Sequence, residues 1–67
     1  MSAQWTAEFV GKMHLHNVSQ IEIAKKLGCT REYVNAVLNG RRAPQNAERT
    51  FRAALDEIIS ERAAQSE

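Results

Sequence analysis

Three polar side chains in residues 31–38 carry hydrogen-bonding groups that match the edges of DNA bases. The Arg31 guanidinium can donate two hydrogen bonds to a guanine, and the Asn35 amide can pair with an adenine. The Glu32 carboxylate can accept from the amino group of a cytosine, but its charge opposes the phosphates, so it could instead pair with Arg31 or hold Arg31 in place. This set of groups predicts contacts with base edges in the major groove.

The helical period assigns these side chains to one face of a predicted recognition helix. A turn of 100° per residue brings Val34, Val37 and Leu38 together, so they point toward a core. Ala36 lies opposite and is small enough to let a thymine methyl group approach. The face turned away from the core is formed by Arg31, Glu32, Tyr33, Asn35, Ala36 and Asn39.

Basic residues surround this helix. Arg41 and Arg42 follow it directly and are expected to contact phosphates, and Tyr33 could add a hydroxyl contact. Residues 25–52 hold seven basic residues against two acidic ones, a net charge of +5, whereas the rest of the chain holds two against six, a net charge of −4. This asymmetry favours docking on a polyanion in one orientation, although a solvated helix surface could carry the same charges.

The stretch 19–40 contains the signals of two short helices joined by a tight turn. Ser19 opens a capping box, S-Q-I-E, which predicts a helix start. Gly28 can adopt the left-handed conformation that ends a helix, and Thr30 can cap the next one. Ala24 is small, as the crossing point of two closely joined helices requires.

This stretch resembles the helix-turn-helix motif of the lambda-repressor and Cro family, the XRE type. Gln20 stands at the first motif position, Ala24 at the fifth and Gly28 at the ninth. The buried positions of the motif hold Ile23, Leu27, Cys29, Val34 and Val37. The resemblance implies that the second helix touches base edges and that Gln20 meets a phosphate at the start of the first. The residues assigned to DNA are Gln20, Thr30, Arg31, Glu32, Tyr33, Asn35, Ala36, Asn39, Arg41 and Arg42.

An amphipathic helix is expected before the motif. The pattern W-x-x-x-F-x-x-x-M in residues 1–14 repeats every four residues, which assigns its aromatic side chains to the core rather than to an exposed patch. Ser2 or Thr6 would cap this helix. Residues 14–17 would then form the connection to the motif.

A long helix is predicted from 47 to about 63. Ile58 and Ile59 are adjacent and diverge by about 100°, so one can face the core while the other faces a partner. Both could instead pack on the aromatic residues of the first helix, with dimers forming only on DNA. We predict a homodimer surface formed by Ile58, Ile59 and Ala63.

Length and composition limit the possibilities. Sixty-seven residues predict one domain, 1–67, and no apolar run approaches the roughly 20 residues that span a bilayer. No basic region followed by an apolar block marks a secretory signal, so we expect a cytoplasmic, nucleoid-associated protein of a prokaryotic cell or phage-infected host. Cys29 is the only cysteine, and a buried apolar role is expected for it rather than a redox role.

The sequence does not favour metal binding or catalysis. His14 and His16 lack the i+4 spacing of a zinc pair, and no carboxylate or second cysteine follows at ligand spacing. We therefore predict no metal and no cofactor, and we expect the histidines to contact a phosphate at most. The chain offers no serine or cysteine nucleophile with a suitable base, and no glycine-rich phosphate loop, so an enzyme is not expected.

These patterns together predict an all-α bundle of about four helices with a long C-terminal helix. The predicted function is sequence-specific binding of double-stranded DNA by a small transcriptional regulator, as a homodimer on a nearly palindromic operator. The alternative is a protein-interaction module, such as an antitoxin or a phage accessory protein, which would expose an apolar stripe on the last helix. Salt-dependent DNA binding would separate the two classes.

Overall fold

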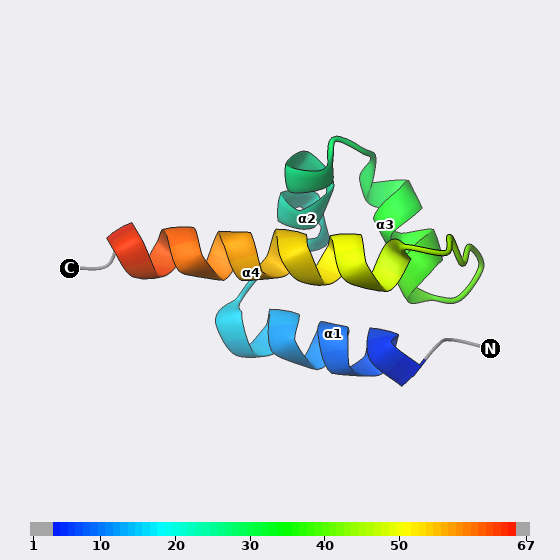
Figure 1. Ribbon diagram of the computed structural model, residues 1–67, viewed down its shortest axis with the longest axis horizontal. Coiled ribbons are helices and arrows are strands. Elements are labelled where there is room, and N and C mark those ends of the chain that lie inside the picture. The colour runs from blue at the N-terminus through cyan, green and yellow to red at the C-terminus, as the bar shows by residue number, and fades with distance from the viewer. Residues whose placement is uncertain (1–3, 66–67) are drawn as a thin grey trace.

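The computed structural model describes residues 4–65, which form four α-helices. These are α1 (Gln4–His16), α2 (Gln20–Leu27), α3 (Arg31–Leu38) and α4 (Ala47–Gln65). In Figure 1, α2 and α3 lie on one side of α4 and α1 lies on the other. α2 packs against α3 and α4, and α1 packs against α4 and α3. The predicted all-α fold with a long C-terminal helix is confirmed.

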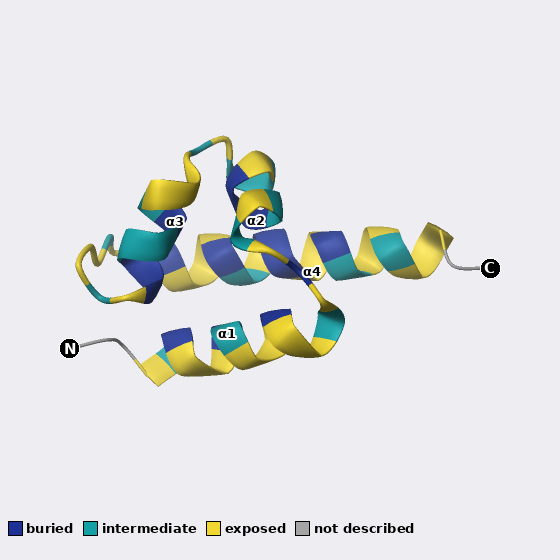
Figure 2. Cartoon of the chain, turned by 180° about the vertical axis from the view of Figure 1, so that it is seen from behind, coloured by how far each residue is buried: buried dark blue, intermediate teal, exposed yellow. Residues whose placement is uncertain are grey.

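Each helix turns most of its apolar residues toward a shared core (Figure 2), although Leu15 in α1 and Ile21 in α2 are exposed. The largest fully buried side chains are Phe9, Phe51, Ile23, Leu55 and Val34. Trp5 is only half-buried, and its ring lies edge-on to Phe9 and Phe51 with centroids 5.8 Å from each. Such aromatic pairs contribute about 0.5–1.5 kcal/mol beyond the burial of their area. The prediction that these aromatic side chains belong to the core is confirmed, with Trp5 at its edge.

The start of α1 differs from the prediction. The helix is already formed at Gln4, and Thr6 lies inside it with 3% of its surface exposed. Thr6 is therefore not the cap, and the other predicted cap, Ser2, lies outside the described residues.

The end of α1 also differs, because the helix continues through His16. Asn17 follows with a φ of 57°, the left-handed conformation that asparagine tolerates better than most residues. Its N–H donates to the carbonyl of His14, and the N–H of Val18 donates to that of Met13. The connection between α1 and α2 is therefore shorter than predicted by most of a helical turn. The helix can extend further because these two hydrogen bonds satisfy carbonyls in its last turn.

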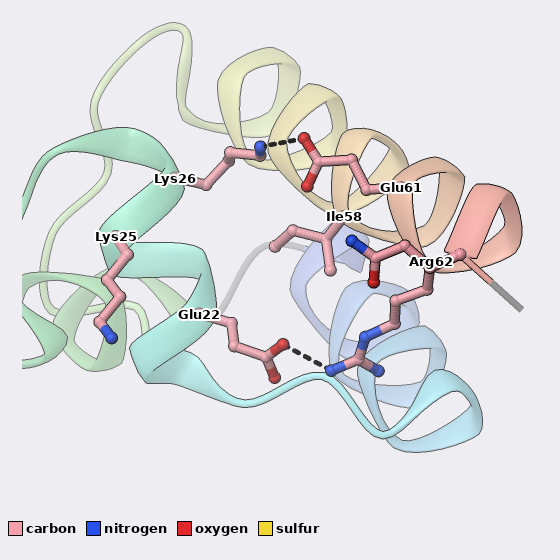
Figure 3. Close-up of a pocket in the computed structure, with 7 residues that line it drawn as sticks. Glu22, Lys25, Lys26, Ile58, Glu61 and Arg62 are labelled. Atoms are coloured by element: carbon pink, nitrogen blue, oxygen red, sulfur yellow. Dashed lines mark hydrogen bonds and ion pairs between the residues drawn. The ribbon is translucent and has the colours of Figure 1, made fainter.

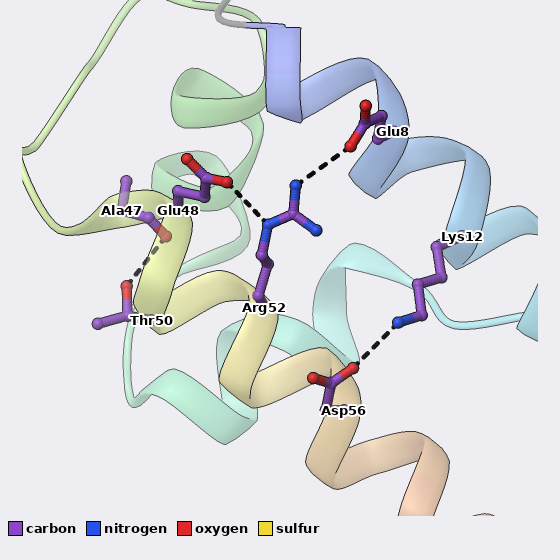
Figure 4. Close-up of polar contacts among 7 residues, drawn as sticks. All are labelled: Glu8, Lys12, Ala47, Glu48, Thr50, Arg52 and Asp56. Carbon is purple, nitrogen blue, oxygen red and sulfur yellow. Dashed lines mark hydrogen bonds and ion pairs between the residues drawn. The ribbon is translucent and has the colours of Figure 1, made fainter.

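Two ion pairs show that α1 and α4 run side by side in the same direction (Figure 4). Arg52 contacts Glu8 at 3.2 Å and also Glu48, one turn earlier on its own helix, at 3.0 Å. Lys12 contacts Asp56 at 3.1 Å. Both pairs between the helices join residues 44 positions apart, so the two helices keep one register along their contact.

Candidate nucleic-acid interface

The start of α2 is fixed by the predicted capping box. The Ser19 hydroxyl accepts from the Glu22 N–H at 3.2 Å, and the Glu22 carboxylate accepts from the Ser19 N–H at 2.9 Å. This second bond is the largest cause of a lowered pKa at Glu22. The bonds hold the first turn of α2, which carries the half-buried Gln20.

The turn between α2 and α3 follows the motif. Gly28 has a φ of 73°, and Ala24 is buried with 4% of its surface exposed. Cys29 and Leu27 were expected to be buried, but both are half-buried and pack against the edge of the core. Partial burial raises the pKa of the Cys29 thiol, because it disfavours the thiolate.

The helix α3 starts and packs as predicted. The Thr30 hydroxyl accepts from the Tyr33 N–H at 3.1 Å and caps the helix. The buried residues of α3 are Val34, Val37 and Leu38, so the opposite face of the helix points outward.

The outward face of α3 holds the side chains that were predicted to read bases. Arg31, Glu32 and Asn39 are exposed, and Tyr33, Asn35 and Ala36 are half-buried. No ion pair joins Arg31 to Glu32 in residues 4–65, so both side chains are available to a ligand.

An unexpected hydrogen bond joins two amides on this face. The Asn39 side chain donates from Nδ2 to Oδ1 of Asn35 at 2.9 Å. The pair is one helical turn apart, a spacing at which side chains meet. The bond orients the Asn35 amide and leaves both hydrogens of the Asn35 Nδ2 free to donate.

The two arginines after α3 are anchored to the helix by their backbone. Gly40 adopts a φ of 81°, which turns the chain back over the last helical turn. The N–H groups of Arg41 and Arg42 then donate to the same carbonyl, that of Ala36, at 2.9 and 3.2 Å. Both side chains are exposed. The arginine pair is therefore a structured extension of α3.

Ion pairing divides the cations into two groups. Lys12, Lys26, Arg52 and Arg62 each contact a carboxylate, and these contacts engage six of the acidic residues (Figures 3 and 4). Within residues 4–65, the cations without a carboxylate partner are Lys25, Arg31, Arg41, Arg42 and Arg49.

The ion pairs confine the free positive charge to fewer residues than the charge count of the sequence suggests. Two cations of the basic stretch, Lys26 and Arg52, are neutralised by acidic residues on α4 and α1. Glu32 is the one acidic residue of 4–65 that lacks a basic partner. The uncompensated positive charge therefore belongs to α2, α3, the loop after α3 and the first turn of α4.

The predicted dimer residues lie at different depths. Ile58 is buried in the core with 7% of its surface exposed, so it cannot form part of an exposed surface. Ile59 is half-buried and Ala63 is exposed. Ile59 also packs against the core. Figure 1 shows the C-terminal end of α4 extending past the other helices.

Two further findings concern metals and membranes. Within residues 4–65, no group of three or more His, Cys, Asp or Glu side chains is arranged to hold a metal ion. His14 is exposed and His16 half-buried. None of the described helices combines the length and apolar character needed to cross a membrane.

Comparison with known proteins identifies the family. Residues 13–48, more than half of the chain, match the family described as Helix-turn-helix. The chain therefore belongs to this family, which is of the XRE type and comprises DNA-binding regulators. Searches of curated proteins and of solved structures gave no match.

Proposed function

We propose that this protein binds specific sites in double-stranded DNA and regulates transcription, with α3 in the major groove. The observation that carries the proposal is the separation of cations: those with carboxylate partners hold the helices together, and those without one lie on and around the helix-turn-helix. Unpaired cations attract phosphates without first breaking an internal ion pair.

In this proposal the base edges are read by the outward face of α3. Arg31 stands at the start of the helix and donates to a guanine, and Asn35 uses its oriented amide on an adenine. Glu32 accepts from a cytosine amino group, and Ala36 leaves space for a thymine methyl group. The bond from Asn39 leaves the Asn35 Nδ2 free to donate to adenine N7, and the second lone pair of the Asn35 Oδ1 can accept from the adenine N6 amino group.

Phosphate contacts flank these bases. Gln20 stands in the first turn of α2, where free N–H groups favour an anion, and the arginine pair stands after α3. The proposed phosphate contacts are Gln20, Thr30, Tyr33, Asn39, Arg41 and Arg42.

We further propose that two copies bind one nearly palindromic operator. A single recognition helix offers few base contacts, whereas two copies double them. Ile59 and Ala63, in the C-terminal half of α4, are the proposed contact between the copies. Repression follows if the operator overlaps a promoter.

The test is salt-dependent binding to a duplex that the chain selects from a random pool. Native affinity should fall steeply with salt, and Arg41→Ala should reduce the slope of log affinity against log salt by about 0.9. Lys12→Ala is the matched control, because Lys12 pairs with Asp56 away from α3. A protein that binds no DNA at low salt, or a slope lowered equally by both changes, would contradict the proposal.

A further inference from the structure

The guanidinium of Arg42 lies over the ring of Tyr33. Its central carbon is 5.9 Å from the ring centroid, within the range of a cation–π contact. Arg42 comes from the loop after α3, whereas Tyr33 stands in the first turns of that helix. The side chain is exposed but reaches back along the helix to Tyr33.

Both partners are held by other contacts. Tyr33 is half-buried and packs against the core, and its N–H is bonded to the Thr30 hydroxyl. The Arg42 N–H donates to the carbonyl of Ala36. The ring is thus a fixed support, and the backbone of the arginine is fixed beside it.

No carboxylate in residues 4–65 competes for this guanidinium. Its central carbon lies over the ring, and no side-chain hydrogen bond of Arg42 is found in the described residues, so its N–H donors stay free for a ligand. Arg41 offers a contrast, since its N–H is bonded to the same carbonyl but no ring contact is found for its side chain in the described residues.

We propose that Tyr33 is a positioning residue that holds Arg42 ready for a DNA phosphate beside α3; this rests on the proposed DNA binding. A free arginine side chain loses rotamer freedom when it binds, and a stacked one has lost part of that freedom already. The ring of Tyr33, rather than its hydroxyl, carries this role. Lysine should replace Arg42 only in part, because an ammonium is also attracted by the ring but lacks the planar fork of N–H donors.

The contact between Arg42 and the Tyr33 ring is tested first, in the protein without DNA. In the NMR spectrum of the free protein, ring current should shift the Arg42 side-chain protons, and Tyr33→Leu should remove that shift. Leucine keeps an apolar side chain on the core, and circular dichroism reports whether the variant keeps its helices. Unshifted Arg42 protons in the native protein would overturn the proposal, whatever the protein does with DNA.

The function is tested by a double-mutant cycle, with a fluorescein-labelled duplex of random sequence as the probe. We expect Tyr33→Leu to bind about two- to fivefold more weakly than Tyr33→Phe in the native background, and the two variants to bind alike in the Arg42→Ala background. The cycle of Tyr33→Phe with Arg42→Ala should show no coupling, because phenylalanine keeps the ring and its contact with the guanidinium. The matched cycle of Tyr33→Leu with Arg41→Ala should be additive.

Arg42→Lys provides a variant that alters only an exposed side chain. It should bind more weakly than the native protein despite its equal charge, and Tyr33→Leu should weaken its binding less than it weakens that of the native protein. Two results would overturn the proposal: equal effects of Tyr33→Leu with and without Arg42, or a loss in Tyr33→Phe as large as that in Tyr33→Leu. A native protein that binds no DNA even at low salt would overturn the proposed function itself.

Discussion

The guanidinium of Arg62 on α4 meets the carboxylate of Glu22 on α2 (Figure 3). The same guanidinium donates to the carbonyls of His16 and Asn17 at the end of α1. The other carboxylate oxygen of Glu22 accepts from the Ser19 N–H. One arginine from the last helix therefore ties together the end of α1, the connection and the first turn of α2.

Removing this arginine should destabilise the fold. Arg62→Met keeps much of the aliphatic stem but leaves two carbonyls and Glu22 without their donor, which should cost roughly 1 kcal/mol because the site is partly exposed. For a domain of this size that corresponds to a fall in Tm of about 4–8 °C. Thermal unfolding followed by circular dichroism measures it. The matched control is Arg49→Met, since Arg49 is exposed and has no carboxylate partner in residues 4–65; equal effects would contradict the role of Arg62.

The same contacts predict how stability depends on pH. The Ser19 N–H and, after the opposing effect of burial, Arg62 lower the pKa of Glu22 in the folded state. The contribution of Glu22 is thus fully present above its unfolded pKa and is lost as the pH falls through the lower folded pKa. Urea unfolding should show Glu22→Gln less stable than the native protein at pH 7, with the difference shrinking in acid. A difference that is constant with pH would rule out this linkage.

The crossing of α2 and α3 depends on a small residue. Ala24 is 4% exposed, so Ala24→Leu must displace packed neighbours, and overpacking of this kind typically costs about 1–3 kcal/mol. The expected result is a clear fall in the free energy of unfolding, or no folding at all. Ala53→Leu, at an exposed position of α4, controls for the substitution itself. A native melting temperature for Ala24→Leu would count against close packing at this crossing.

Sequence reasoning located the motif well because its signals are local. Ser19, Gly28 and Thr30 act on backbone groups within a few residues, and each does in the structure what its chemistry predicts. The stripe of Val34, Val37 and Leu38 follows from the helical period alone, which also determines the outward face of α3.

Features that depend on distant residues could not be predicted. Arg62 stands in the last turn of α4, but its contacts lie 40 to 46 positions away in the chain. The pairing of Lys26 and Arg52 likewise depends on the packing of α4, so counting charges overstated the free positive charge. Periodicity also allowed either Ile58 or Ile59 in the core, and only packing places Ile58 there.

Substitutions on the outward face of α3 should weaken binding to a selected duplex more than binding to random DNA. Arg31→Ala or Asn35→Ala should cost about 1–3 kcal/mol on a selected duplex and much less on random DNA, because only the former offers matched base edges. Fluorescence anisotropy with the two duplexes measures the ratio. Asn39→Ala removes the donor that orients Asn35 and should lower the same ratio to a smaller extent. Equal losses on both duplexes would make these side chains phosphate contacts.

The last prediction concerns assembly on DNA. Two copies on one operator would place their recognition helices about 34 Å apart, so half-sites should be centred about 10 base pairs apart. Ile59→Asp brings like charges into the proposed contact and should weaken binding to two half-sites while leaving binding to one unchanged. Ala63→Asp should do the same without touching the core, because Ala63 is exposed. Ala64→Asp, turned by about 100° on the helix, is the matched control. If Ala63→Asp and Ala64→Asp bind the two-site duplex alike in folded protein, the copies do not meet through the end of α4.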